Sequence, residues 1–239
     1  MTSLTHEERL RYQRQLMIPG IGEEGQGLLA GASVVVIGAG GLGSPVLMYL
    51  AAAGVGRIGI VDSDEVNTGN LQRQILYETG DITKSKAETA AEKLGRINPH
   101  IEVRAYPVRF TEENAGEILA GYDVAVDCSD NYSTRYILCD ATIRAGIPMV
   151  YGAVREFMGQ ASVFNYRGGT SYRDLYPEEM HIATVDNSGP PGVMGPLPGI
   201  VGAMQACEVI KIITGTGEVL SGRLLQVDAL SLRMDIISI

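Results

Sequence analysis

The chain has 239 residues, of which 45% are hydrophobic and 20% charged, and its formal net charge at pH 7 is −9. This length fits one large domain or one domain with an appendage, and the composition is typical of a soluble globular protein. A nucleic-acid binder normally carries a basic stripe, whereas this chain is acidic and its Lys and Arg residues form no cluster. We therefore do not expect DNA or RNA as a ligand.

The N-terminal sequence and the cysteines indicate the compartment. Residues 1–15 lack the apolar core of a signal peptide, and we find no apolar run approaching the roughly 20 residues that span a bilayer. Cys128, Cys139 and Cys207 are far apart and form no CxxC pair. These features predict a cytoplasmic protein with no membrane segment, no disulfide framework and no cysteine zinc site.

Strand and helix patterns alternate through the first two thirds of the chain. A polar-faced helix is predicted over 4–17 and another over 23–30, in an N-terminal helical segment that we bound at residues 1–32. The following strands are predicted over 33–38, 57–62, 101–106, 123–128 and 148–153. Helices are predicted between them over 44–53, 84–98 (capped by Thr83), 111–119 and 132–145. Such alternation predicts an α/β fold, a Rossmann-like doubly wound and mostly parallel sheet flanked by helices.

The pattern changes near residue 155. A strand is predicted over 160–166, an irregular Pro- and Gly-rich stretch over 171–199, a helix over 197–214 and antiparallel strands over 223–239. We assign residues 33–239 to one domain, in which 155–239 form a crossover loop and a C-terminal β/α part. An irregular stretch this long is more often a functional loop or disordered than scaffold.

A glycine cluster follows the first predicted strand. Gly38, Gly40 and Gly43 satisfy the GxGxxG spacing, with Gly41 between them, and Asp62 ends the next strand 19 residues later. Glycines let backbone approach phosphate at a helix N-terminus, and the carboxylate can accept hydrogen bonds from ribose hydroxyls. Alone, this motif indicates an adenine nucleotide, with a purely structural turn as the alternative.

The residues after the second strand help to decide which nucleotide binds. Asn70, Arg73 and Gln74 lie on a predicted helical turn, and Lys84 and Lys86 follow. A nicotinamide pocket has no need for converging cations, whereas a triphosphate does, because they neutralise phosphate charge and stabilise departing pyrophosphate. For a single Arg or Lys, a solvated helix face is the simpler interpretation.

The fourth strand ends in a second polar cluster. Asp127, Asp130 and Asn131 follow it and should face the same crevice as the glycine turn. Mg²⁺ prefers one or two carboxylates plus phosphate oxygens, so Asp130 is a candidate ligand. Asp130 or Asn131 could also cap the next helix, and the two roles are compatible.

Taken in order, these motifs resemble one family, the ThiF/MoeB/HesA adenylyltransferases, bacterial relatives of ubiquitin-activating enzymes. The resemblance covers nearly the whole chain and lies in RYxRQ (11–15), GxGGLG (38–43), DxD (62–64), NLQRQ (70–74), KSK (84–86), NP (98–99), DCxDN (127–131), TR (134–135), GQ (159–160), GVMGP (192–196) and the run from Gly199 to Glu208. NLQRQ and DCxDN are far more specific than the glycine turn.

The resemblance implies a reaction and a set of ligands. Such enzymes adenylate the C-terminal Gly-Gly carboxylate of a small ubiquitin-like sulfur-carrier protein, consuming Mg·ATP and releasing pyrophosphate. Carried over by position, the residues expected to bind ATP are Gly38, Gly40, Gly41, Gly43, Asp62, Asp64, Asn70, Arg73, Gln74, Lys86, Asp130 and Asn131. Arg73, Lys86 and Asp130 would also act in catalysis, with Asp130 on Mg²⁺. Arg14 resembles an arginine finger supplied from residues 1–32 of the other subunit of a homodimer.

The sequence departs from the family at two places. Many members carry zinc on two CxxC pairs, but Ser171 and Asp174 stand at the first pair and the chain stops at Ile239, before the second. Structural zinc needs four good ligands, so we predict none. Ser188 stands where relatives often have a loop cysteine, which argues against a covalent thioester or persulfide there. We expect sulfur from a separate donor.

Three alternatives remain at this level. A member of the same family could adenylate a non-protein carboxylate, as do tRNA threonylcarbamoyl dehydratases, although the acidity of this chain disfavours RNA. An NAD-dependent oxidoreductase is disfavoured by Arg73, Lys86 and the DCSDN segment. A degenerate binding scaffold is disfavoured because every expected nucleotide ligand is present. The sequence names neither the carrier nor its pathway.

Overall fold

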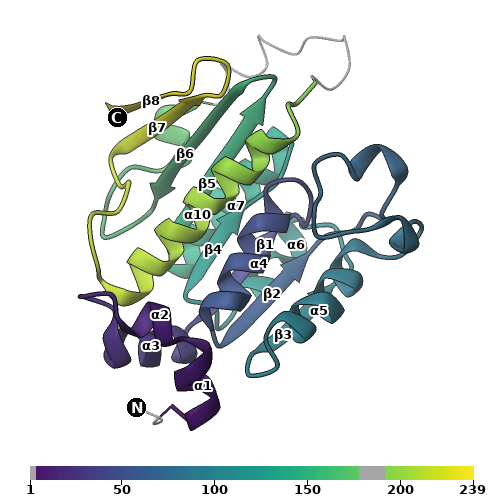
Figure 1. Ribbon diagram of the computed structural model, residues 1–239. Helices are drawn as coiled ribbons and strands as arrows, with labels where there is room; N and C mark the ends of the chain where they lie inside the picture. The colour runs from purple at the N-terminus through teal and green to yellow at the C-terminus, as the bar shows by residue number, and fades with distance from the viewer. Residues whose placement is uncertain (1–3, 178–191) are drawn as a thin grey trace.

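The computed structural model describes residues 4–177 and 192–239 (Figure 1). Their strands form one sheet in the order β3-β2-β1-β4-β5-β6-β7-β8. Pairs from β3 to β5 are parallel and those from β5 to β8 antiparallel. The predicted fold class is confirmed. The strands are β1 Ser33–Ile37, β2 Arg57–Val61, β3 Glu102–Tyr106, β4 Val124–Asp127, β5 Met149–Arg155, β6 Met158–Phe164, β7 Arg223–Asp228 and β8 Arg233–Ser238.

Helices cover both faces of the sheet (Figure 1). On one face lie α4 (Gly43–Ala53), α5 (Lys86–Ile97) and α10 (Pro196–Thr214), and on the other α6 (Glu112–Leu119), α7 (Tyr132–Ala145) and α8 (Tyr172–Leu175). Alternate β1 residues enter the two cores, Val34 and Val36 on one side and Val35 and Ile37 on the other. This explains why the central strands are continuous apolar runs.

The N-terminal segment differs from the single helix predicted over 4–17. Helix α1 (His6–Arg11) and helix α2 (Gln13–Leu16) are separated at Tyr12, which is buried and accepts a hydrogen bond of 2.8 Å from Asn98 Nδ2. The break lets the aromatic ring enter the domain, so burial overrides helix continuity. Helix α3 (Gly22–Gly31) agrees with the helix predicted over 23–30.

The connection from β2 to α5 contains two 3₁₀ helices, η1 (Thr68–Asn70) and η2 (Thr79–Asp81). The predicted cap of α5 at Thr83 is wrong, because Ser85 is the N-cap and its hydroxyl accepts from the Glu88 amide. Thr83 instead has a positive φ of 74° in the preceding turn. The connection therefore ends two residues later than the sequence suggested.

Helix α10 is long and apolar enough, by length and composition, to cross a membrane. The expectation that no apolar run approaches this length was therefore too strict. In the structure α10 packs against α4, β5 and β6, and Leu197, Val201 and Val209 enter the core. Its apolar character is accounted for by this central position, where it covers the sheet beside the glycine turn (Figure 1).

Candidate functional site

The strand order reverses between β1 and β4, which are parallel neighbours in the centre of the sheet. In doubly wound sheets, ligands bind at the carboxyl ends of the strands at such a switch point. The glycine turn follows β1 and the DCSDN segment follows β4, so both lie at this edge. The topology thus brings together the two motifs that the sequence singled out.

The glycine turn is tightly constrained by its neighbours. Gly38 has φ +98°, and a Cβ built there would lie 2.6 Å from the carbonyl oxygen of Cys128. A Cβ on Gly43 would overlap the carbonyl oxygen of Gly38. Gly40 and Gly41 lie beside Gln74 and Arg73, respectively. Packing therefore requires glycine at positions 38 and 43. Gly40 and Gly41 bring the backbone of the turn next to Gln74 and Arg73.

Asp62 follows β2 and is tied to the glycine turn. One carboxylate oxygen accepts from the Ala39 amide at 2.7 Å and the other from the Asp64 amide at 2.8 Å. Burial raises the pKa of Asp62, while these two amides and Lys86 oppose the rise. A carboxylate has about four lone-pair sites, so acceptor capacity for ribose hydroxyls remains.

Lys86 and Asp64 form an ion pair beside this carboxylate. Lys86 Nζ lies 2.9 Å from Asp64 Oδ2, and the Lys86 side chain is 6% exposed whereas that of Asp64 is 67% exposed. The Lys86 amide also donates to the Asp64 carbonyl at 2.9 Å. The sequence placed both residues at the nucleotide but missed that Asp64 is the counterion that holds the buried ammonium group.

Asn70, Arg73 and Gln74 lie on one turn, closed by a 2.9 Å bond from the Gln74 amide to the Asn70 carbonyl, as predicted. Within the described residues, the side-chain oxygens of Asn70 and Gln74 are buried without a hydrogen-bond partner. Buried polar atoms are rarely left unpaired, so each calls for a partner. Gln74 lies beside Gly40 and Asn70 belongs to the same turn, so hydroxyl or amino groups of a bound nucleotide, or metal-bound water, would be suitable partners.

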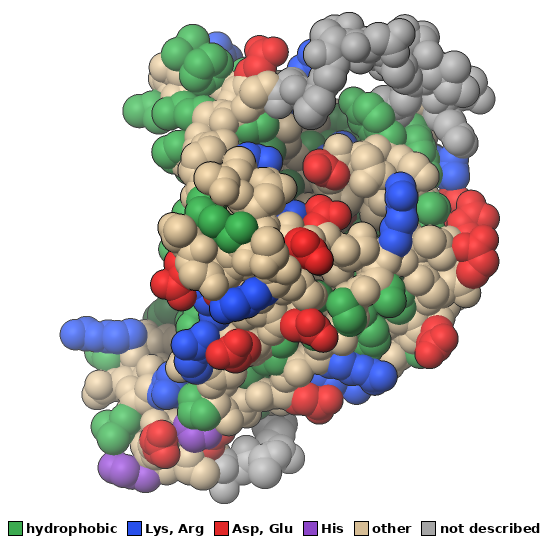
Figure 2. Space-filling model, turned by 90° about the vertical axis from the view of Figure 1, so that its right-hand side faces the viewer, with side chains coloured by type: hydrophobic (Ala, Val, Ile, Leu, Met, Phe, Trp, Pro, Cys, Tyr) green, Lys and Arg blue, Asp and Glu red, His purple; other side chains and the backbone are tan. Residues whose placement is uncertain are grey.

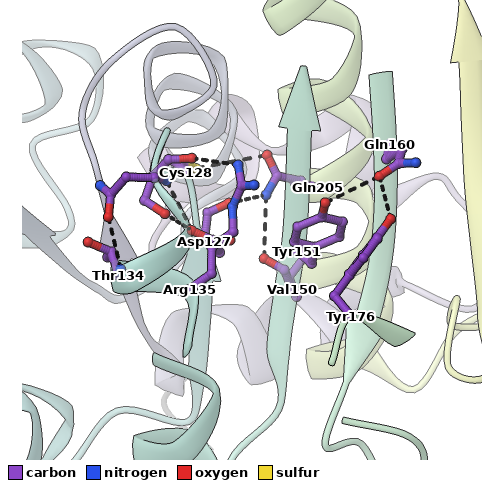
Figure 3. A network of polar contacts seen from close by, with 11 residues as sticks. Asp127, Cys128, Thr134, Arg135, Val150, Tyr151, Gln160, Tyr176 and Gln205 are labelled. Atoms are coloured by element: carbon purple, nitrogen blue, oxygen red, sulfur yellow. Dashed lines mark hydrogen bonds and ion pairs between the residues drawn. The ribbon is translucent and has the colours of Figure 1, made fainter. Parts of the chain in front are cut away.

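The segment after β4 is built on a buried ion pair (Figure 3). Asp127 is fully buried, accepts from the Ser129 amide and hydroxyl, and lies 3.4 Å from Arg135 Nε. Arg135 in turn donates to the Ser129 carbonyl at 3.1 Å. Burial raises the pKa of Asp127, and Arg135 opposes the rise. Asp127 therefore does not share the crevice with Asp130, contrary to the prediction.

Asp130 and Asn131 occupy the exposed end of this segment. Asn131 is the N-cap of α7, its side chain accepting from the Thr134 amide at 2.9 Å, which matches one of the two predicted roles. Asp130 is thus free of the capping function. Asp130 is exposed, so its carboxylate is accessible to a ligand.

Gln205 was missed as a structural element of the site. It is fully buried on α10, and its amide nitrogen donates to the carbonyls of Asp127 at 2.7 Å and Val150 at 3.4 Å (Figure 3). It lies directly over Gly152, where a Cβ would come within 2.6 Å of its amide nitrogen. The sequence signal was a glutamine in an apolar helix, which indicates a buried polar tie between α10 and the strand ends.

Magnesium would have few protein ligands here. Across the described residues, no three His, Cys, Asp or Glu side chains group in a way that could hold a metal ion. Mg²⁺ tolerates this, because it commonly binds one or two carboxylates, substrate phosphates and water. The Asp130 carboxylate therefore fits an ion that arrives with ATP better than a resident metal.

The remaining predicted residues lie away from this crevice. Helix α2, which carries Arg14, packs at the C-terminal end of α4 through a bond from Gln15 to the Ala53 carbonyl. The glycine turn lies at the other end of α4, so Arg14 does not join the site of its own chain. Ser171 and Asp174 form a capping box on α8, with bonds of 2.7–3.3 Å. Ser188 lies outside the described residues.

Charges of both signs are interspersed on the face drawn in Figure 2. No continuous basic stripe crosses the described side chains of that face, in keeping with the net charge of −9. At the crevice, the Arg73 side chain lies beside Gly41 and the Lys86 ammonium group pairs with Asp64.

The structure is a doubly wound α/β fold in which a glycine turn, the Asp62 carboxylate and the side chains of Arg73 and Lys86 lie at the carboxyl ends of the central strands. Comparison with known families is specific: the ThiF family matches residues 12–239, and the chain belongs to it. The predicted resemblance to ThiF/MoeB/HesA adenylyltransferases is confirmed.

The relatives agree with this assignment. The chain is 49% identical over 231 residues to a sulfur carrier protein adenylyltransferase of Thermus thermophilus, covering 95% of this chain and 85% of that protein. It is 46% identical over 242 residues to a probable adenylyltransferase/sulfurtransferase MoeZ of Mycobacterium tuberculosis, covering 100% and 62%. A mouse adenylyltransferase and sulfurtransferase MOCS3 is 46% identical, covering 95% and 50%. The chain thus spans about half to three fifths of the two longer relatives.

Solved structures support the fold. Escherichia coli MccB with ATP superposes with a TM-score of 0.84 at 21% identity, covering 95% of this chain and 72% of that one. The crystal structure of PaaA gives 0.85 at 20% identity, covering 100% and 76%. At this identity the likeness concerns the fold.

Proposed function

We propose that this protein is an ATP-dependent adenylyltransferase that activates the C-terminal Gly-Gly carboxylate of a ubiquitin-like sulfur-carrier protein. The observation that carries the proposal is the crevice at the switch point, where Asp62 is hydrogen-bonded to the glycine turn, Arg73 lies beside Gly41 and Lys86 pairs with Asp64. The relative named as a sulfur carrier protein adenylyltransferase favours a protein substrate over the non-protein carboxylate of the dehydratase alternative. An NAD-dependent oxidoreductase would not need the positive charges of Arg73 and Lys86 at this position.

In this proposal, different elements of the site bind different parts of the nucleotide. Asp62 accepts from the ribose hydroxyls, and the turn from Gly38 to Gly43 offers backbone amides to the phosphates. Arg73 and Lys86 neutralise the phosphates and stabilise pyrophosphate as it leaves. Lys86 must leave Asp64, or share it, to do so, because the two are ion-paired at 2.9 Å.

The carrier carboxylate attacks the α-phosphate, the bond to the bridging oxygen breaks, and acyl-adenylate and pyrophosphate result. Asp130 would hold Mg²⁺, which draws charge from the phosphates, and Asn70, Gln74 and Asn131 would orient the nucleotide and metal waters. Gln74 and Asn70 support this assignment through their unpartnered buried oxygens. Phosphoryl-group chemistry of this kind depends mainly on positioning and charge stabilisation.

Residues 1–32 would serve a homodimer, with residues 33–239 as the ATP-binding adenylation domain. Arg14 is exposed and lies at the edge of the sheet opposite its own crevice. Arg14 would therefore act by reaching the phosphates bound to the partner subunit. In other phosphoryl-transfer enzymes, an arginine supplied in trans increases the rate about 10³–10⁵-fold.

Sulfur would come from a separate donor after adenylation, and a cytoplasmic location fits this biosynthetic role. No zinc is assigned, since Ser171 and Asp174 are engaged in the capping box of α8. The names of MoeZ and MOCS3 include a sulfurtransferase activity, and the chain covers only part of those proteins.

The direct test is to incubate the protein with Mg·ATP and carriers ending in Gly-Gly and to measure the intact mass of each carrier. We expect the mass to increase by one AMP, and Asp130→Ala should abolish the product. A carrier whose last glycine is removed is the matched control. No adduct with any carrier would contradict the proposal, whereas an adduct on a small carboxylate would favour the second candidate substrate.

A further inference from the structure

Tyr77 lies between the segments of the nucleotide site, although no motif assigned it a role. Its side chain is buried, and its hydroxyl lies 2.8 Å from the Ala39 carbonyl and 3.2 Å from the Lys86 carbonyl. Ala39 belongs to the glycine turn, and Lys86 is the first residue of α5. One side chain thus touches the backbone of two segments that would bind the phosphates.

These contacts close a cycle in which the single proton of the Tyr77 hydroxyl is shared between the two carbonyls. The Ala39 amide donates to Asp62 at 2.7 Å, and the Asp64 amide donates to the other oxygen of Asp62 at 2.8 Å. The Lys86 amide donates to the Asp64 carbonyl at 2.9 Å, and the Tyr77 hydroxyl donates to the Ala39 carbonyl at 2.8 Å, with the Lys86 carbonyl at 3.2 Å as a weaker acceptor of the same proton. The cycle fixes the glycine turn, the end of β2 and the start of α5 relative to one another.

Tyr77 also anchors the turn that carries the other expected phosphate ligands. Its amide donates to the Gln74 carbonyl at 3.1 Å, and the Gln74 amide donates to Asn70 at 2.9 Å. Arg73 lies on the same turn, with its side-chain stem beside Gly41. The frame that passes through Tyr77 therefore reaches all the segments that would meet the triphosphate, except the one after β4.

We propose that the Tyr77 hydroxyl is a positioning group of the ATP site, an inference that rests on the proposed function. It would not contact the reacting atoms. Its role is to hold Arg73, Lys86 and the glycine turn in one arrangement, so that they meet the same triphosphate together. Preorganised donors contribute most when no rearrangement is needed on binding.

The test compares Tyr77→Phe with Tyr122→Phe. Both rings are buried to a similar degree, 6% and 5% exposed, and the Tyr122 hydroxyl also has a partner, the Tyr106 hydroxyl at 3.2 Å. Tyr122 belongs to the core on the other face of the sheet. The two variants thus remove one buried hydroxyl each, near and far from the site.

Isothermal titration calorimetry of the full chain with Mg·ATP gives the dissociation constants, and thermal unfolding gives the stabilities. We expect Tyr77→Phe to weaken ATP binding about tenfold, the effect of losing one hydrogen bond of ordinary strength. Tyr122→Phe should bind ATP within about twofold of wild type, while the two variants lose similar thermal stability.

Two results would overturn the positioning role. One is ATP affinity in Tyr77→Phe within twofold of wild type, and the other is an equal weakening in Tyr122→Phe, which would indicate general loosening. If the wild-type protein binds no ATP, the proposed function itself fails and the positioning role fails with it. Selective weakening in folded Tyr77→Phe supports the assignment.

Discussion

The buried pair of Asp127 and Arg135 provides a quantitative test of how the segment carrying Asp130 is held. Asp127 is fully buried, the Arg135 side chain is 10% exposed, and the two lie 3.4 Å apart. Replacing Arg135 by Met keeps much of the side-chain volume but leaves the carboxylate without its countercharge. Removing one partner of a buried pair costs about 3–5 kcal/mol, so we expect a loss of that size in the free energy of unfolding.

The loss should depend on pH, because the uncharged carboxyl tolerates burial. The pKa of Asp127 is raised by burial, and Arg135 opposes the rise, so the variant should raise it further. A raised folded-state pKa gives stability at low pH that disappears as the pH rises through that pKa. Arg135→Met should therefore lose less stability near about pH 5 than near about pH 8.

Urea unfolding at both pH values measures the effect, with Arg144→Met as the matched control. Arg144 is exposed on the same helix, and its replacement should change stability by only about 0.5 kcal/mol. The double variant Asp127→Asn with Arg135→Met should lose about 1–3 kcal/mol less free energy of unfolding than the two single variants' losses added together. A loss in Arg135→Met below about 1 kcal/mol that does not change with pH would refute this reasoning.

Three further predictions concern the glycine turn, Asp81 and Arg14. Gly43→Ala should abolish ATP binding measured by calorimetry, because the new methyl group overlaps a carbonyl oxygen of the glycine turn, whereas Gly95→Ala, in open space on α5, should leave binding unchanged. Burial alone would raise the pKa of Asp81, but hydrogen bonds from two lysines and an amide hold this pKa at about 2. The ionised Asp81 therefore stabilises the folded protein above the unfolded-state pKa, and this contribution is lost as the pH falls toward 2. Acid unfolding should be shallower in Asp81→Asn, and an identical pH profile would contradict this. Mixing inactive Arg14→Ala and Asp130→Ala subunits should restore roughly a quarter of wild-type activity, because half of the dimers then contain one complete site; no recovery despite confirmed subunit exchange would contradict supply in trans.

The fold was predictable because local pattern and topology agree. Apolar runs such as Val34–Ile37 alternate with helix patterns of the right length, and this alternation leaves little choice but a parallel sheet with helices on both faces. Tyr12 and Thr83 were mispredicted because the outcome depends on tertiary contacts. The buried Tyr12 ring breaks a helix, and a positive φ at Thr83 moves the start of α5.

The part of the site formed by residues directly after strands was predictable from the sequence. Residues after β1, β2 and β4 must meet at one edge of the sheet, and so Gly38, Asp62 and Asp130 could be placed together from sequence. The buried supports could not, because Asp127, Arg135 and Gln205 look like ordinary polar residues until the packing of α7 and α10 is known. Asp127 was assigned to the crevice because its burial is invisible in the sequence.

The central claim is that the crevice uses ATP to activate a carrier carboxylate. ATP–pyrophosphate exchange with Mg²⁺, measured with and without carriers ending in Gly-Gly, tests it most directly. We expect exchange that requires a carrier and is lost in Asp130→Ala, with ATP binding still measurable in the wild-type protein. Exchange that proceeds equally in Asp130→Ala, or its absence with every carrier despite tight ATP binding, would contradict the claim.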